Sequence, residues 1–424
     1  TSVSPDRGPA SAAITLTGTN FLTGATVSVG GVAATSVNVV SDTQITCNVP
    51  AAGLTRGAKN VVVTNLNTTT NTLTNGFTFG IPIGNIVTGV AGNQAFALAD
   101  GVGTNARFKG PANMTRNAAG TNLYLADQGG AIRKTAIAGT THTVSTLAGA
   151  DALGVADGLG AAARFQRAWG VVVDPTETFL YVSDTDAHRI CRVQIANGNV
   201  TTIAGGLQGH VNGTGTAARF NFPVGMALNP AGTELYIACR GDNTIRKLVL
   251  ADGAVSTIAG ADVASTAALP VTGSYLDGTG TAARFREPYG LVFDHTGTVL
   301  YIADRLNNRI RKMVLADGSV STVCGTGVRS FLDGVGTAAM TSQPWSLAMD
   351  PFGVFLYIAA QDHALQRVVL AIGQVTRFVG GPQGNIDGTG LAAQTSEPQG
   401  MVVMPDGATG YFGDGTLRIR RVGD

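Results

Sequence analysis

"DGTGTAARFREPYGL" runs from Asp277 to Leu291, and this stretch determines how the whole chain is interpreted because it is repeated. Close or partial copies follow one another along most of the sequence. The copies begin at residues 100, 157, 212, 277, 333 and 387. A spacing of roughly 55 residues is typical of a propeller or a solenoid, in which each repeat is one supersecondary unit.

The fourth copy shows what one repeat contains. Four apolar segments follow one another, "YGLVFD" (289–294), "TVLYIAD" (298–304), "NRIRKMVL" (308–315) and "GSVSTVCG" (318–325). Short turns rich in Gly, Asn and Asp separate them, as expected between antiparallel strands. Four short antiparallel strands make one propeller blade, so six copies predict six blades.

The two ends of the repeat region predict how the ring closes. The last copy ends in "TLRIRRVGD" (416–424), which is a third strand with no fourth strand after it. The missing strand is found ahead of the first copy, where "GNIVTGVAG" (84–92) reads like the fourth strands elsewhere. We therefore expect residues 85–92 to pair with the third strand of the last blade, near residues 418–422, and to leave no open sheet edge.

Composition limits the classes of function. The chain has 424 residues, of which 58 are Gly and 13% are charged, with a net charge of +1. This charge provides no field for gathering nucleic acid, and no run of 18 apolar residues could span a bilayer. We expect neither nucleic-acid binding nor membrane insertion. Because the sequence begins at Thr1 without an initiator Met, we also expect a processed or excised piece of a larger precursor.

Residues 1–80 contain no copy of the repeat and predict a separate β-sandwich. The segment resembles a TIG (IPT) domain, an immunoglobulin-like module, through "SPDRGP" from Ser4, "ITLTGTNF" from Ile14, "VSVGGVAA" from Val27 and "ITCNVP" from Ile45. The resemblance implies that Phe21 and the Gly30-Gly31 turn are structural. We expect this domain to cover 1–80 and the propeller to cover 81–424.

The repeats resemble the NHL repeat. The segment "PYGLVFDHTGTVLYIADRLNNRIRKM" (288–313) carries the Pro-x-Gly start, the "LYIAD" strand and the "NRIRK" strand of that family. The resemblance implies an all-β chain, an immunoglobulin-like β-sandwich plus a six-bladed β-propeller closed by an N-terminal strand. Members of the family serve mainly as recognition platforms, and some related propellers are lyases or lactonases with a metal in the channel.

Two short motifs recur with the blade and are interpreted as structural, because a residue repeated with the blade usually serves the blade. The Arg-Phe pair of the repeat predicts a buried Phe and an Arg that bonds loop carbonyls, against the alternative of a cation ring around an anion. The "AD" aspartate predicts a carboxylate that bonds amides at the end of the second strand, against the alternative of a metal ligand. The residues are Arg107, Arg164, Arg219 and Arg284, then Phe108, Phe165, Phe220 and Phe285, then Asp127, Asp184, Asp304 and Asp414.

We predict no catalytic residue, no bound metal and no cofactor. The first strands should line the central channel, and Arg116 is their one ionisable residue. A metal site needs converging His, Asp or Glu side chains. No Cys-x-x-Cys spacing occurs, so Cys47, Cys191, Cys239 and Cys324 are expected to be free, mostly buried thiols.

One repeat position does not follow the needs of the scaffold, namely the residue after the Pro of Pro-x-Gly. Both Trp residues of the chain fall there, although the position elsewhere accepts small residues. Aromatic groups are common at recognition sites, whereas the alternative is that they fill the channel. The candidate binding residues at this channel mouth are Trp169, Tyr289, Trp345 and Gln399, beside Ala112 and Val224.

The sequence thus favours a non-catalytic, extracellular or cell-surface protein with a binding or structural function, such as adhesion. Its expected partner is a protein or a glycan. Two alternatives stay open: a lyase or lactonase acting in the channel, and a purely architectural protomer that forms a homo-oligomer or a head-to-tail fibre.

Overall fold

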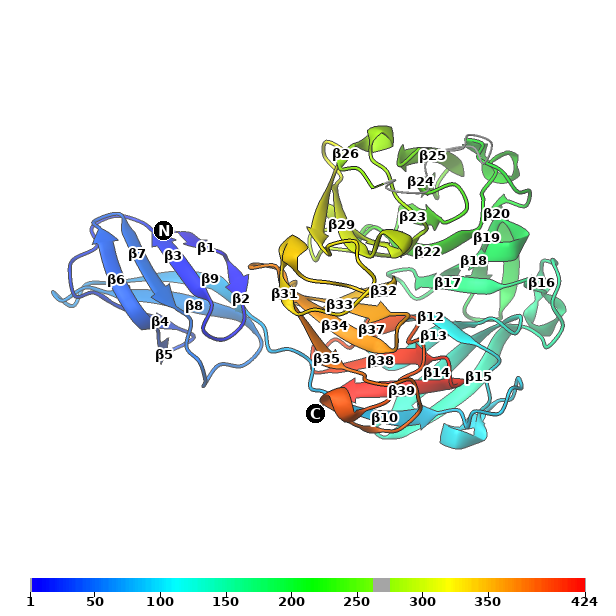
Figure 1. Cartoon of the computed structure of the whole chain (residues 1–424), viewed down its shortest axis with the longest axis horizontal. Coiled ribbons are helices and arrows are strands. Elements are labelled where there is room, and N and C mark those ends of the chain that lie inside the picture. The colour runs from blue at the N-terminus through cyan, green and yellow to red at the C-terminus, as the bar shows by residue number, and fades with distance from the viewer. Residues whose placement is uncertain (1, 262–274, 424) are drawn as a thin grey trace.

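The computed structural model describes residues 2–261 and 275–423, and in them the chain is all-β, as predicted. A two-sheet sandwich at the N-terminus lies beside a ring of six sheets (Figure 1). Among the described residues there is no helix of the length and apolarity needed to cross a bilayer.

The N-terminal sandwich packs a four-stranded sheet, in the order β1-β3-β7-β6, against a five-stranded sheet, in the order β2-β9-β8-β4-β5. Alternation along β3 buries Ile14 and Leu16 and exposes their neighbours, so one face of each sheet enters the core with Phe21 and Phe77. The predicted immunoglobulin-like sandwich is confirmed. Its strands are β1 (Ser2–Ser4), β2 (Arg7–Gly8), β3 (Ala13–Thr17), β4 (Thr26–Val29), β5 (Val32–Ala33), β6 (Thr35–Ser41), β7 (Gln44–Asn48), β8 (Gly57–Thr64) and β9 (Thr70–Phe79).

The six blades form the predicted propeller, with the first strand of each blade at the channel. These first strands are β12 (Pro111–Arg116), β17 (Ala168–Val173), β22 (Pro223–Leu228), β27 (Pro288–Phe293), β32 (Pro344–Met349) and β37 (Met401–Val403). The second strands are β13 (Asn122–Asp127), β18 (Phe179–Asp184), β23 (Glu234–Cys239), β28 (Val299–Asp304), β33 (Phe355–Ala360) and β38 (Thr409–Asp414).

Third and fourth strands complete the blades outward. The third strands are β14 (Ala131–Ala138), β19 (Arg189–Gln194), β24 (Thr244–Val249), β29 (Arg309–Val314), β34 (Ala364–Val369) and β39 (Arg418–Gly423). The fourth strands are β15 (Thr141–Gly149), β20 (Asn199–Gly205), β25 (Ala254–Ala259), β30 (Ser319–Cys324), β35 (Gln374–Val379) and, from the N-terminal side, β10 (Ile86–Ala91).

The ring closes as predicted. β10 pairs antiparallel with β39, with Ile86 opposite Gly423, Val87 opposite Val422 and Thr88 opposite Arg421. Because β39 already pairs with β38 on its other side, the strand from the N-terminal end supplies the outer part of the last blade. The prediction that residues 85–92 close the propeller is confirmed.

Each blade has five strands, whereas the repeat pattern predicted four. The Asp-Gly-x-Gly segment is not only a connection, because its first Gly begins a two-residue strand outside the fourth strand. These outer strands are β11 (Gly101–Val102), β16 (Gly158–Leu159), β21 (Gly213–Thr214), β26 (Gly278–Thr279), β31 (Gly334–Val335) and β36 (Gly388–Thr389).

A single turn of 3₁₀ helix follows each outer strand and connects two blades. In η5 (Gly280–Ala282) the Gly280 amide donates to the Gly318 carbonyl in its own blade, and the Gly260 amide of the preceding blade donates to the Gly280 carbonyl. This second Gly has a φ of +54°, in the left-handed region that favours glycine, and the equivalent Gly in the other copies also has a positive φ. The other turns of this kind are η1 (Gly103–Asn105), η2 (Gly160–Ala162), η4 (Gly215–Ala217), η7 (Gly336–Ala338) and η8 (Gly390–Ala392).

A fully buried arginine of the third strand holds the repeated phrase in place. The Arg311 guanidinium bonds Asp304 at 2.9 Å and Asp277 at 2.7 Å, and it donates to the carbonyls of Arg284 and Leu276. Its guanidinium also lies over the Phe285 ring, 5.3 Å from the centroid. Arg133, Arg246 and Arg420 hold the same place in their blades and are likewise 0% exposed.

The structural interpretation of the "AD" aspartates is confirmed. Asp304 accepts from the Arg286 amide at 2.8 Å and from the Asn307 side chain, as well as from Arg311. Burial raises the pKa of Asp304, while the amide of Arg286 and the guanidinium of Arg311 act in the opposite direction. These carboxylates therefore serve the end of the second strand and its turn.

The Arg-Phe pair is structural in part as predicted. Phe108, Phe165, Phe220 and Phe285 are at most 2% exposed. The Arg284 side chain donates to the carbonyls of Thr281 and Ala283, at 2.7 and 2.9 Å, and Arg164 makes the matching bonds. Arg107 and Arg219 have exposed side chains, although all four arginines form the same backbone bridge, to Ala99, Ala156, Val211 and Leu276.

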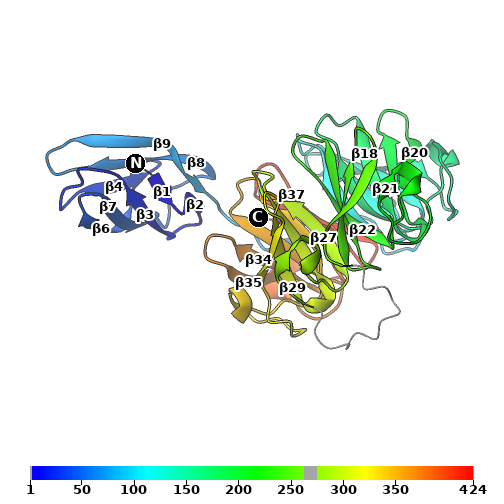
Figure 2. The same ribbon diagram turned by 90° about the horizontal axis from the view of Figure 1, so that it is seen from above.

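The sandwich contacts the propeller at the turns between first and second strands. Arg7 donates to the Phe352 carbonyl at 3.0 Å in the turn before β33. In the segment that leads from the sandwich to β10, the Ile83 amide donates to the hydroxyl of Tyr357 in β33 at 2.8 Å. Ile83 is 2% exposed and belongs to the core cluster of the neighbouring blades. The sandwich therefore lies to one side of the ring, near blades four to six (Figure 2).

All four cysteines are buried, as predicted, and none is within disulfide distance of another. Burial raises the pKa of Cys47 to about 11 and those of Cys191 and Cys324 to about 12. At pH 8 these thiols should stay protonated, so we expect the folded protein to react with 5,5′-dithiobis(2-nitrobenzoate) at least about 100-fold more slowly than exposed cysteine. In denaturant without reductant the same reagent should count four thiols, and a lower count would contradict the expectation of free cysteines.

Candidate functional site

The structure brings three of the four predicted site residues into contact at one mouth of the channel. The rings of Trp169 and Tyr289 meet edge to face with centroids 5.2 Å apart, and those of Tyr289 and Trp345 stack with centroids 6.2 Å apart and planes 14° apart. Each ring comes from the start of a different first strand, β17, β27 or β32. Neighbouring blades therefore place the same repeat position side by side.

Arg305 completes this group, and we call Trp169, Tyr289, Trp345 and Arg305 the mouth cluster. Its guanidinium lies 5.2 Å from the Tyr289 centroid and 5.7 Å from the Trp345 centroid, which is cation–π geometry. The same side chain bonds Glu287 and donates to Gln361 at 2.8 Å. It belongs to η6 (Arg305–Asn307), the turn between the second and third strands.

Gln399 lies on a separate polar chain at the same mouth. Gln128 donates to the Gln399 side-chain oxygen at 3.0 Å and accepts from Arg167 at 3.2 Å. Gln399 is 8% exposed, and the Arg167 side chain is 42% exposed. These planar amide and guanidinium groups therefore extend the rim of the channel mouth beyond the aromatic rings.

Exposure divides the candidate residues in a way that the sequence did not show. Trp169 is 3% exposed and Tyr289 is 8% exposed, and both belong to one core cluster with Ala112 and Val224. Burial raises the pKa of Tyr289, while the cations of Arg240 and Arg305 act in the opposite direction. Trp345 is partly exposed, so it offers a free surface next to Arg305.

The Trp345 ring also carries an unpaired donor. Its indole N–H has no hydrogen-bond acceptor among the described residues, and the same holds for Nε of Arg305. An unpaired buried donor costs about 1–3 kcal/mol, and both atoms are enclosed by protein rather than presented at the surface. The groups that the cluster presents at the surface are therefore the partly exposed Trp345 ring and the Arg305 cation beside it.

The sequence analysis missed Arg305, Arg240 and Gln128, although a signal was present. All three directly follow the last residue of a second strand, whose copies read "LYLAD", "LYVSD", "LYIAC", "LYIAD", "LYIAA" and "YFGD". The residue at this position varies from blade to blade, just as it does after the Pro of Pro-x-Gly. Variation of polar residues at one repeat position marks a surface that the fold does not need.

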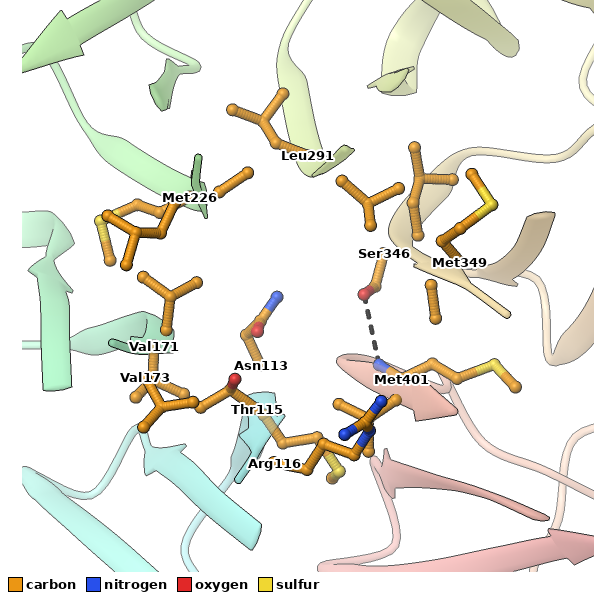
Figure 3. Close-up of a pocket in the computed structure, with 18 of the residues that line it drawn as sticks. Asn113, Thr115, Arg116, Val171, Val173, Met226, Leu291, Ser346, Met349 and Met401 are labelled. Carbon is orange, nitrogen blue, oxygen red and sulfur yellow. Dashed lines mark hydrogen bonds between the residues drawn. The ribbon is translucent and has the colours of Figure 1, made fainter. Parts of the chain in front are cut away.

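Behind the mouth cluster the channel holds a cavity of about 370 Å³ lined by all six first strands (Figure 3). Most of the lining is apolar. Asn113, Thr115, Arg116 and Ser346 are its polar side chains of the described residues, and Arg116 alone is ionisable. Within residues 2–261 and 275–423 no three His, Cys, Asp or Glu side chains gather where they could hold a metal ion.

Comparison with known proteins supports both parts of the architecture. Residues 1–80 match the family model of the IPT/TIG domain. "Protein SUPPRESSOR OF QUENCHING 1, chloroplastic" from Arabidopsis thaliana is 29% identical over 287 residues, which are 66% of this chain and 26% of that protein. "NHL repeat-containing protein 2" from Bos taurus is 29% identical over 199 residues, 46% of this chain and 27% of that protein. This chain thus spans about a quarter of the length of each relative.

Solved structures share the fold at low sequence identity. An "auxiliary nutrient binding protein" from Bacteroides thetaiotaomicron superposes with a TM-score of 0.61 and 17% identity, over 100% of this chain and 96% of that one. A "gluconolactonase" from Xanthomonas campestris superposes with a TM-score of 0.50 and 13% identity, over 81% of this chain and 97% of that one. The first structure extends over the sandwich and the propeller together. The chain is therefore an IPT/TIG domain followed by a six-bladed β-propeller of the NHL-repeat type.

Proposed function

We propose that this protein is a non-catalytic binding module at the cell surface or outside the cell, and that the mouth cluster recognises its ligand through Trp345 and Arg305, with the buried Trp169 and Tyr289 rings behind them. The observation that carries the proposal is the partly exposed Trp345 ring stacked on Tyr289 with Arg305 against both. The same repeat position accepts Ala112 and Val224, so the fold does not require large rings there.

The chemistry of this rim favours a saccharide over a protein partner. The apolar face of a sugar ring packs on an aromatic ring, and its hydroxyl groups bond donors and acceptors held in a plane. Arg305, Gln343 and Gln361 provide such groups beside Trp345. The nutrient-binding protein of the same two-domain fold is in keeping with this proposal.

A channel enzyme receives less support from the described residues. A lyase or lactonase of the propeller type would need converging metal ligands or a general base within the channel. The one ionisable lining residue in the described part of the chain is Arg116, whose charge suits neither role. The lactonase alternative therefore rests on the shared fold, and the fibre alternative on no contact in the structure.

Trp345→Ala is expected to weaken ligand binding by about 2 kcal/mol, roughly 30-fold, with little change in the melting temperature. A glycan array with the whole chain would first identify a ligand, and titration calorimetry would then give the dissociation constants. The reason for the large effect is that the partly exposed ring supplies contact area beside the Arg305 cation.

Trp169→Ala is the matched control, because Trp169 occupies the same repeat position but is buried. We expect it to lower the free energy of unfolding by about 3 kcal/mol and to leave the affinity of the folded fraction nearly unchanged. If both variants lost stability and neither lost affinity, the rings would only fill the channel and the proposed site would be wrong.

A further inference from the structure

The cavity inside the channel, which begins directly behind the mouth cluster, is a second place where the structure offers binding groups. Five of its six walls are formed mainly by Val, Leu, Met, Ala and Phe side chains. The sixth wall is β12, which presents Asn113, Thr115 and Arg116 in succession (Figure 3). The cavity is therefore amphipathic across its width.

Asn113 stands where the repeat pattern has glycine. At Gly170, Gly225, Gly290 and Gly400 an added Cβ would come within 2.0–2.8 Å of backbone atoms in the next blade. Asn113 instead points into the cavity (Figure 3), and no hydrogen bond of its amide to the described residues is found. Neither strand pairing nor blade packing explains a free amide at this place.

Arg116 lies at the end of β12 and carries a charge that the fold does not neutralise. Its Nε donates to the Val403 carbonyl at 2.6 Å and its Nη1 to the Asn117 carbonyl at 3.1 Å. No carboxylate of the described residues lies within ion-pair distance of this guanidinium. Partial burial lowers the pKa of Arg116, although Asp406 acts in the opposite direction from farther away. Such a cation gains from an anion at its free edge.

A second hollow of about 440 Å³ shares Arg116, Val173 and Leu228 with the channel cavity. Asp174 and Glu177 also line it, but their oxygens already accept several bonds each, from Thr178 and Phe179 and from Asn122 and Tyr124. Arg116 thus stands between the two spaces. A ligand entering from this side meets Arg116 and the two hydrogen-bonded carboxylates first and the apolar walls next.

From these observations we propose that the channel binds a small linear amphipathic monoanion, a carboxylate or sulfonate whose apolar chain lies along the Val, Leu and Met walls. Arg116 binds the anionic group at the entrance. Asn113 and Thr115 bond polar atoms along one side of the chain. A cavity of 370 Å³ lies within the size range of small-molecule sites, which are mostly apolar with a few placed polar groups.

The test uses the whole chain and decanoate as the probe, with 1-decanol as its uncharged counterpart, both measured by displacement of 8-anilinonaphthalene-1-sulfonate. We expect one decanoate per chain and at least about 10-fold weaker binding of decanol. Arg116→Gln should weaken decanoate binding at least about 10-fold and leave decanol unchanged. Arg192→Gln, at an exposed position on the third strand of blade two, is the matched control and should leave both unchanged.

Thr115→Cys provides a second test in case the Arg116→Gln variant does not fold. Because the four native thiols are buried, the new thiol should be the fast-reacting one with N-ethylmaleimide. Decanoate should slow its modification at least about 5-fold at saturation. Three results would each overturn the proposal. They are equal modification with and without decanoate, no displacement of the dye at about 1 mM decanoate, and equal binding of decanol and decanoate.

Discussion

Arg311→Gln is expected to lower the free energy of unfolding by about 3–5 kcal/mol, because it leaves a buried carboxylate without its counter-ion. Asp304 and Arg311 are both 0% exposed, and the guanidinium joins four partners that belong to three different segments. Glutamine can keep one of these bonds at most. Equilibrium urea denaturation monitored by tryptophan fluorescence would measure the loss.

Blade five contains the natural control for this experiment. There the aspartate is replaced by Ala360 and the arginine by Gln366, whose amide donates to the Met340 carbonyl at 3.0 Å. The double variant Asp304→Ala with Arg311→Gln would reproduce that arrangement in blade four. We expect the double variant to cost about 1–3 kcal/mol less than the sum of the two single variants. Additive losses would show that the ion pair is not what makes Arg311→Gln costly.

The repeats in the sequence predicted which residues have a structural role, but they did not predict which of these residues contact one another. The "AD" aspartate and the Phe of the repeat were recognised as structural because they recur with the blade. Their common partner, the third-strand arginine, recurs equally often, as "IRK" in three blades and "IRR" in the last, but was interpreted only as part of a strand. The contact depends on the packing of the 3₁₀ turn against the third strand, some 27 residues apart for Arg284 and Arg311, and no local pattern reveals it.

Cys191 shows how a departure from the pattern is accommodated. It occupies the place of the buried arginine in blade two, where Arg189, two residues earlier, bonds Asp184 at 2.9 Å and Asp157 at 2.9 Å instead. Because residues two apart on a strand point to the same face, Arg189 can reach the same carboxylates from the next position. Both Arg189 and Cys191 can be read from the sequence, but the bonds that Arg189 makes to Asp184 and Asp157 are seen only in the structure.

The candidate site was predictable in position but not in exposure. Variation at one repeat position located Trp169, Tyr289 and Trp345 at the channel mouth, and their contacts follow from the ring of blades. Which ring stays exposed depends on how the three side chains fill a narrow mouth together. Arg305 joins them from the neighbouring turn, where a varying polar residue was equally visible in the sequence but was not considered.

Val87→Asp is expected to open the propeller, with a loss of about 4 kcal/mol or more in the free energy of unfolding. Val87 is the second residue of β10, is 0% exposed, and stands opposite Val422 on one side and Gly388 on the other. A carboxylate there would be buried without a counter-ion in the strand that closes the ring.

Ile86→Asp is the matched control, since the adjacent residue is 42% exposed and points to the other face, and its cost should stay below about 1 kcal/mol. Limited proteolysis of the Val87→Asp variant should cut first in blade six, because an unpaired β39 edge lets that blade separate from its neighbours. Equal melting temperatures for the two variants would mean that β10 adds little to the ring, and that the propeller is held closed by the contacts among the other blades.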